Sequence, residues 1–172
     1  MSPTDLRHEL SQCLARLWRY AMVLSRKPDV ADDLVQSTCV RALERCAQVV
    51  DRAGADRWFF SILHSLWVNE LRAQHVRQGQ GFVDVSETDV PADAFSFEDR
   101  HWHTQVMQRV NALPEAQRNA VFLVYVEGFT YQEAAMTLSV PIGTIMSRLA
   151  AARLSLAKDT GSGAQPQQGE KT

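Results

Sequence analysis

The sequence predicts an all-α protein made of two small helical domains, residues 1–78 and 96–158, joined by a flexible linker at residues 79–95. Three observations favour this fold class. Apolar residues recur at the spacing of a helix face in both domains. Glycine and proline are sparse, with 8 and 6 residues in a chain of 172. A hydrophobic content of 45% is enough for one large core or two small ones.

The first domain is predicted to contain three helices. Apolar residues at helical spacing from Leu10 to Leu24 form the first helix, and Pro28 with Asp29 ends it. The second helix is expected over about 30–49 and the third over about 56–77. The Ala-Gly-Ala sequence at 53–55 marks the turn between them. Three long helices of this kind form a small bundle.

The second domain has stronger helix boundary signals. Ser96 with Asp99 fits a capping box, which predicts a helix that continues through Val110. Pro114 suits the first turn of the next helix, because proline lacks the N–H that would be unpaired there. Gly128 suits the left-handed residue that ends this helix.

The end of the second domain predicts a helix-turn-helix motif. Thr130 with Glu133 is a second capping box, and the short helix that it begins runs to Leu138. A turn over 139–143 precedes a last helix over about 142–158. A short helix, a tight turn and a longer helix are typical of the motif. Three residues should hold its two helices together: Ala135, Val140 and Ile145.

The outer face of the last helix carries the candidate DNA contacts. Thr144, Ser147 and Arg148 fall where a recognition helix meets base edges and phosphates. Arg153 lies further along and suits a phosphate contact. The alternative is an ordinary helical hairpin whose arginines are only solvated.

The linker, the tail and the lack of long apolar runs complete the organisation. The linker is acidic, with Asp84, Glu87, Asp89 and Asp93 and no base, and residues 159–172 are expected to be a disordered tail. The chain has no apolar run of the roughly 18–20 residues that span a bilayer, and no signal-peptide core at its N-terminus. We therefore expect a cytoplasmic protein.

Metal and redox chemistry are not indicated. Cys13, Cys39 and Cys46 lack CxxC spacing, which excludes an obvious disulfide framework or zinc knuckle. Cys39 and Cys46 share a helix face, so a redox or metal switch is conceivable, but small buried core residues are the favoured interpretation. We expect no metal and no cofactor.

Two sets of motifs together identify a family. The set in the second domain consists of Leu113-Pro114-Glu115, residues 127–135, and residues 140–149 with Ala152-Arg153. The set in the first domain consists of residues 18–21, residues 31–38 with 41–43, and residues 58–62. They resemble regions four and two of the extracytoplasmic-function (ECF) subfamily of sigma-70 factors. The resemblance covers roughly residues 8–158 and keeps the order of the two regions.

The resemblance implies a dissociable specificity subunit of bacterial RNA polymerase that has no active site or small-molecule substrate of its own. It implies that the segment 32–36 packs against the clamp helices of the polymerase core, with its carboxylates meeting basic groups and its apolar side chains anchoring the contact. Asp32 and Asp33 could equally complement the helix dipole, and both roles can hold together. The implied core-binding residues are Asp32, Asp33, Leu34, Val35 and Gln36.

The resemblance also implies that residues 48–55 and the helix after them face the minus-ten promoter element, with one base flipped out of the stack. The implied contacts are Arg52, Trp58, Trp67, Asn69 and Arg72. Trp58 could instead belong to the core. Trp67 lies off the main apolar stripe, which predicts that it is exposed.

The helix-turn-helix would read the minus-thirty-five element. The implied contacts are Tyr131, Gln132, Pro141, Thr144, Ser147, Arg148 and Arg153. The sequence departs from the family pattern at Leu63-His64-Ser65, where Ala-Arg-Asn is common, and at Met146 and Ala150-Ala151, where cations are common. Fewer cations neutralise fewer phosphates. We therefore expect the isolated second domain to bind its DNA weakly and to depend on tethering to polymerase.

Partners and alternatives follow from the same motifs. The expected partners are the large subunits of core RNA polymerase, promoter DNA and an anti-sigma factor that holds the two domains closed. An inhibitor in the membrane would keep the protein near the inner membrane. A dimeric operator-binding regulator is the first alternative, although it leaves the segments 32–36 and 58–62 without a role. A hydrolase using Asp32, Asp33 and Glu44 is the second, but no phosphate loop or nucleophile elbow supports it.

Overall fold

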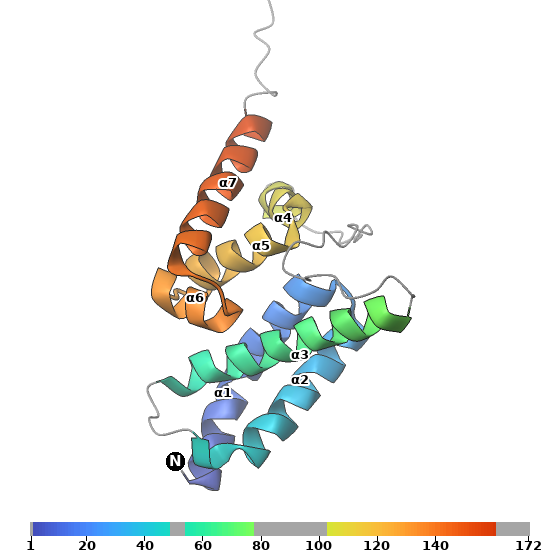
Figure 1. The fold of residues 1–172 in the computed structure, drawn as a ribbon, viewed down its shortest axis with the longest axis vertical. Coiled ribbons are helices and arrows are strands. Elements are labelled where there is room, and N and C mark those ends of the chain that lie inside the picture. The colour runs from blue at the N-terminus through green and yellow to red at the C-terminus, as the bar shows by residue number, and fades with distance from the viewer. Residues whose placement is uncertain (1, 49–53, 78–102, 161–172) are drawn as a thin grey trace, which may run out of the picture.

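The first domain is a three-helix bundle, as the sequence predicts (Figure 1). The computed structural model describes residues 2–48, 54–77 and 103–160. Helices α1 (Pro3–Ser25), α2 (Pro28–Glu44) and α3 (Ala55–Arg77) pack on one another, and a 3-10 turn, Cys46–Gln48, follows α2. The second helix therefore ends earlier than the expected residue 49.

Local signals set the helix ends in this domain. Ser2 caps α1 by accepting a hydrogen bond from the backbone N–H of Asp5. Arg26 ends α1 in the left-handed conformation, with φ 57°, and its N–H bonds the carbonyl of Met22. Pro28 then occupies the first turn of α2, where its missing N–H leaves no donor unpaired.

The second domain begins with α4 (His103–Ala112) and α5 (Glu115–Val121). Pro114 is the N-cap of α5, one residue before the first helical position where the sequence places it. The sequence predicts one continuous helix to Gly128, but a π-helical segment, Phe122–Val126, follows α5. Gly128 then adopts φ +72°, which confirms the left-handed end. The Ser96–Asp99 capping box lies outside the described residues.

Helices α6 (Tyr131–Leu138) and α7 (Ile142–Thr160) form the predicted helix-turn-helix. Both halves of the Thr130–Glu133 capping box are present. Ala135 and Ile145 are buried where the two helices pack, and Val140 is half-buried against the same core. None of the described residues lies in a β-strand. Among them no single helix is long and apolar enough to cross a membrane. Only α6 together with residues Ile142–Ala157 has that length and composition as a pair, and this pair is bent by 104°.

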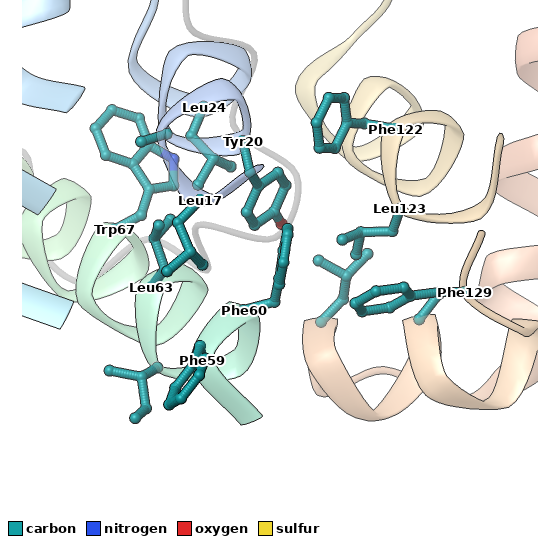
Figure 2. Packing of buried hydrophobic residues seen from close by; sticks show 14 of the residues in the cluster. Leu17, Tyr20, Leu24, Phe59, Phe60, Leu63, Trp67, Phe122, Leu123 and Phe129 are labelled. Atoms are coloured by element: carbon teal, nitrogen blue, oxygen red, sulfur yellow. The ribbon is translucent and has the colours of Figure 1, made fainter. Parts of the chain in front are cut away.

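The two domains pack against each other through a continuous apolar interface. Helix α3 contacts α6, and α1 contacts α5 (Figure 1). Figure 2 shows Tyr20 and Phe60 of the first domain facing the aromatic rings of the second. Tyr20 stacks on Phe122 at 5.5 Å between ring centroids, and Phe60 meets Phe129 edge-on at 5.2 Å. The sequence predicts two domains, but it does not predict this contact.

Candidate functional site

The acidic segment of α2 presents three of its five expected core-binding residues to solvent. Asp32, Asp33 and Gln36 are exposed, and Val35 is half-buried. Leu34 is only 6% exposed and belongs to the core of the bundle. The side chain of Leu34 attaches α2 to its own domain, which leaves Asp32, Asp33 and Gln36 as the accessible candidates of the segment.

The candidate minus-ten residues divide between one face of α3 and the domain interface. Asn69 and Arg72 are exposed, and Trp58 is half-buried against Phe59, with 5.8 Å between their rings. At 3.6 residues per turn these three candidates fall within an arc of about 60°, so they share one face of the helix. Arg52 lies outside the described residues.

Trp67 is buried, which contradicts its expected exposure. Only 5% of the residue is accessible, and its indole Nε1 donates a hydrogen bond to Oε1 of Glu115 at 2.7 Å. Burial raises the pKa of Glu115. Helix α3 has apolar contacts on two sides, one with α1 and α2 and one with the second domain. Trp67 therefore links the two domains and faces no DNA in this arrangement.

His64 occupies the position where the family commonly has arginine, and its ring is turned inward. The ring is half-buried, and its Nδ1 lies 3.1 Å from the hydroxyl of Tyr20. Burial, followed by the positive charge of Arg148, lowers the pKa of His64 to about 4. The imidazole is therefore uncharged at neutral pH and offers no cation to a phosphate.

The recognition helix α7 presents mainly uncharged groups. Met146 and Ser147 are exposed, Thr144 is half-buried, and the hydroxyl of Ser147 donates to the Thr144 carbonyl at 2.9 Å. Pro141 is exposed at the turn, and Arg153 is exposed further along the helix. These side chains can offer hydroxyl and apolar contacts to base edges, including thymine methyl groups.

The helix α6 that precedes it contributes two further candidates. Gln132 is exposed, and Tyr131 is half-buried against the core. Arg148 differs from its expectation of a fully outward position, because it is half-buried and its charge acts on His64 of the first domain. Part of the expected DNA-reading surface is therefore less accessible than the sequence predicts.

Ion pairs surround the aromatic interface between the domains. Nε of Arg16 lies 2.7 Å from Glu127, whose side chain is 2% exposed, and Nε of Arg57 lies 3.1 Å from Glu133. Arg16 also pairs with Asp56 at 3.2 Å. Burial opposes ionisation of Asp56, but hydrogen bonds and charge from Arg57, followed by the hydrogen bond from Arg16, lower its pKa. The same residue, Glu133, caps α6, so the N-terminus of α6 is fixed to the first domain.

Arg118 is an interface residue that sequence reasoning missed. It is 2% exposed, and its guanidinium donates to the carbonyls of Val23 at 3.0 Å and Leu113 at 2.9 Å. A single arginine between Gln117 and Asn119 gives no signal in the sequence, because its acceptors are backbone carbonyls from two separate helix ends.

Comparisons with known proteins agree with the geometry. The model "Sigma-70 region 2" matches residues 10–77, and "Sigma-70, region 4" matches residues 103–156. The ECF RNA polymerase sigma factor EcfG of Rhodopseudomonas palustris is 31% identical over 159 residues, which cover 91% of this chain and 86% of that protein. SigC of Mycobacterium tuberculosis is 33% identical over 149 residues, covering 83% and 76%.

A solved structure supports the same assignment over the whole fold. The sigma factor RpoE from Bartonella quintana, in complex with the anti-sigma factor NepR, has a TM-score of 0.70 and 30% identity. The match covers 93% of this chain and 99% of that one. The order of the two regions, the helix-turn-helix and the similarity along nearly the full length lead to one conclusion: the chain belongs to the ECF subfamily of the sigma-70 family of RNA polymerase sigma factors.

Proposed function

We propose that this sigma factor binds core RNA polymerase through α2 and directs it to promoters through α3 and the α6–α7 motif. The observation that carries the proposal is that one chain contains both sigma-70 regions, and each leaves candidate contact residues accessible. We also propose that the chain is divided into a first domain at 1–78, a linker at 79–95, a second domain at 96–158 and a tail at 159–172. The protein acts by binding, in the cytoplasm, and the chemistry of transcription stays with the polymerase.

The residues have different roles in this function. Asp32, Asp33 and Gln36 meet basic groups on the core, where electrostatic complementarity gives specificity and a fast encounter. Asn69 and Arg72, beside the half-buried Trp58, contact the melted minus-ten strand by hydrogen bonds, charge and stacking.

Recognition of the minus-thirty-five element falls to exposed residues of α6 and α7. Gln132, Thr144 and Ser147 offer hydrogen-bonding groups, and Arg153 suits a phosphate. Arg148 is half-buried, so it offers less of its side chain to DNA than Arg153 does. Tyr131 and Pro141 lie at the starts of the two helices, where they suit contacts to the DNA backbone.

We also propose that an anti-sigma factor controls this chain. The Bartonella quintana relative was solved in complex with such an inhibitor. The interface here is already closed by Glu127, Glu133 and the aromatic pairs, so an inhibitor that binds both domains would strengthen an arrangement that covers Arg148. An inhibitor that binds only the open form would do the opposite. A search for partners by co-purification from the native cell, with domain spacing measured in the complex, distinguishes the two.

Charge reversal on α2 tests core binding. Asp33→Arg should abolish co-elution with purified core polymerase, whereas Glu44→Arg, an exposed acid near the end of the same helix, should co-elute like the wild type. Both variants should keep the wild-type helical content. Normal co-elution of Asp33→Arg would show that the docking surface is elsewhere.

Promoter binding by the holoenzyme tests the DNA contacts. Arg148→Ala should weaken binding to a promoter fragment by about 1–3 kcal/mol if Arg148 contacts a base edge. The test uses a fragment selected from genomic DNA by the wild-type holoenzyme. Specific binding of that fragment by the chain alone, as a dimer, would instead favour an operator-binding regulator.

A further inference from the structure

Trp18 lies on the surface of α1, and its polar edge is joined to α2. The residue is 38% exposed, and its indole Nε1 donates a hydrogen bond to Oδ1 of Asp32 at 2.8 Å. Asp32 is itself exposed and lies in the acidic segment proposed to bind polymerase. An indole N–H can only donate, so the bond orients the carboxylate in one way. A large aromatic side chain that stays outside the core has another use than holding the bundle together.

The bond leaves most of the accepting capacity of Asp32 available. An ionised carboxylate accepts through two oxygens, each with two lone pairs, and the indole uses one of these positions. Fixing the side chain in advance removes part of the ordering entropy that a partner would otherwise have to overcome on binding. Trp18 therefore acts on Asp32 as a positioning residue.

The ring of Trp18 is also part of an apolar strip. Leu14 lies one helical turn before Trp18 and is 40% exposed. Helices α1 and α2 are consecutive, joined by a short turn, and packed along each other (Figure 1). Because they run in opposite directions, Leu14 is level with Gln36, one turn beyond Asp32. An apolar strip from α1 therefore lies beside the carboxylates of α2.

This combination matches one kind of partner. Carboxylates beside an exposed tryptophan and leucine fit an amphipathic helix that carries basic groups along one side and apolar groups along the other. Tryptophan is among the residues that most often dominate the energy of an interface. The strip is continuous with the α2 surface, so the same helix of the polymerase core can cover both.

We propose that the polymerase-docking surface extends from α2 onto α1, with Trp18 positioning Asp32 and offering its ring, together with Leu14, to a basic amphipathic helix of the core. This inference rests on the proposed function. It adds two residues that the acidic motif does not contain.

A double-mutant cycle tests the positioning role. Trp18→Phe keeps an aromatic ring and removes the N–H, and the dissociation constant for core polymerase is measured with the full chain. We expect Trp18→Phe to weaken binding about 3- to 5-fold, in line with the upper range for an exposed charged pair. In the Asp32→Ala background the same change should have less than about a 2-fold effect, because nothing remains to be positioned. An equal effect in both backgrounds would overturn the positioning role.

Two further variants test the contact role and the fold. Trp18→Ala and Leu14→Ala should each weaken core binding about 10-fold or more, with thermal unfolding near that of the wild type because both residues are exposed. Val76→Ala, an exposed apolar residue at the end of α3, is the control and should bind normally. Wild-type binding by both Trp18 variants would overturn the inference. If Asp33→Arg also bound normally, the proposed docking function would fail as well, so the two failures are distinguishable.

Discussion

Replacing Arg16 with alanine should loosen the closed packing of the two domains. The Arg16 side chain is 30% exposed and pairs with Glu127 at 2.7 Å and with Asp56 at 3.2 Å. Its guanidinium also lies 5.5 Å from the centre of the Phe60 ring. Glu127 is 2% exposed in the wild-type structure, and without Arg16 its remaining ion-pair partner among the described residues is Arg19 at 3.8 Å. The variant therefore leaves a carboxylate buried in the closed arrangement with poor compensation.

The magnitude follows from the unequal burial of the pair. Breaking a fully buried ion pair costs about 3–5 kcal/mol, and an exposed pair contributes about 0–1 kcal/mol. With one partner buried and the other accessible, about 2 kcal/mol is expected. Glu127 regains water when the domains separate, so this penalty applies to the closed state. A loss of about 2 kcal/mol raises the relative population of the open state by roughly 30-fold.

Hydrogen exchange at the indole N–H of Trp67 reports on that opening. The N–H is bonded to Glu115 across the interface at 2.7 Å, so it exchanges when the domains part. In Arg16→Ala we expect roughly 30-fold faster exchange by NMR and a larger radius by small-angle scattering. Arg7→Ala, on the same helix but exposed, is the matched control.

Two results would refute the reasoning. Unchanged Trp67 exchange in Arg16→Ala would mean that the ion pair does not hold the domains together. The second concerns the cause of the opening. Because the penalty comes from a buried charge, adding Glu127→Gln to Arg16→Ala should slow exchange again; if exchange stays equally fast, lost packing of Arg16 is responsible.

Three further changes follow from single residues. The unfolded chain binds a proton at His64 below about pH 6.5, but the folded protein does so only near pH 4, so the free energy of unfolding should fall by up to about 3 kcal/mol as pH drops through this window. In His64→Gln, the urea-denaturation midpoint should therefore depend less on pH between 7 and 4. If the midpoints of variant and wild type change with pH in parallel, His64 is not responsible. Gly128→Ala forces a side chain into φ +72° and should cost about 1 kcal/mol by chemical denaturation, with an unchanged midpoint counting against the strain. Thr130→Ala removes the α6 cap and should cost about 1 kcal/mol, whereas Thr130→Ser should retain it; equal losses in both would mean that the hydroxyl is not what matters.

Sequence reasoning succeeded where a few neighbouring residues decide the structure. The Thr130–Glu133 capping box and the left-handed Gly128 are confirmed because each depends on a backbone group within three or four residues. The end of α2 and the π-helical segment after α5 were not predicted. In the π-helical segment the apolar pattern continues although the backbone conformation changes. The positions of Phe122 and Leu123 are determined by packing against residues that are distant in the sequence, such as Tyr20.

The exposure of the site residues was harder to predict for a related reason. A helix with one buried face shows one apolar stripe, and Trp67 was placed outside that stripe on α3. Trp67 is buried all the same, beside Leu17 and Leu24 of α1 (Figure 2), and its indole N–H bonds Glu115 of α5, a partner that only the folded second domain supplies. Leu34 shows the same difficulty, because a partner contact and a core contact look alike in a sequence, and the structure places this side chain in the core.

The two binding surfaces are unequally available in the closed protein. Asp32, Asp33 and Gln36 are exposed, whereas Arg148 is half-buried and Glu133 is paired with Arg57. A ligand that binds the closed and open forms equally cannot shift their ratio, however tightly it binds. Docking on α2 alone therefore leaves Arg148 half-buried, although Ser147 and Arg153 of the same helix are exposed. Opening requires a partner that gains contacts with the residues of the interface, and such a partner competes directly with the aromatic and ionic pairs between the domains.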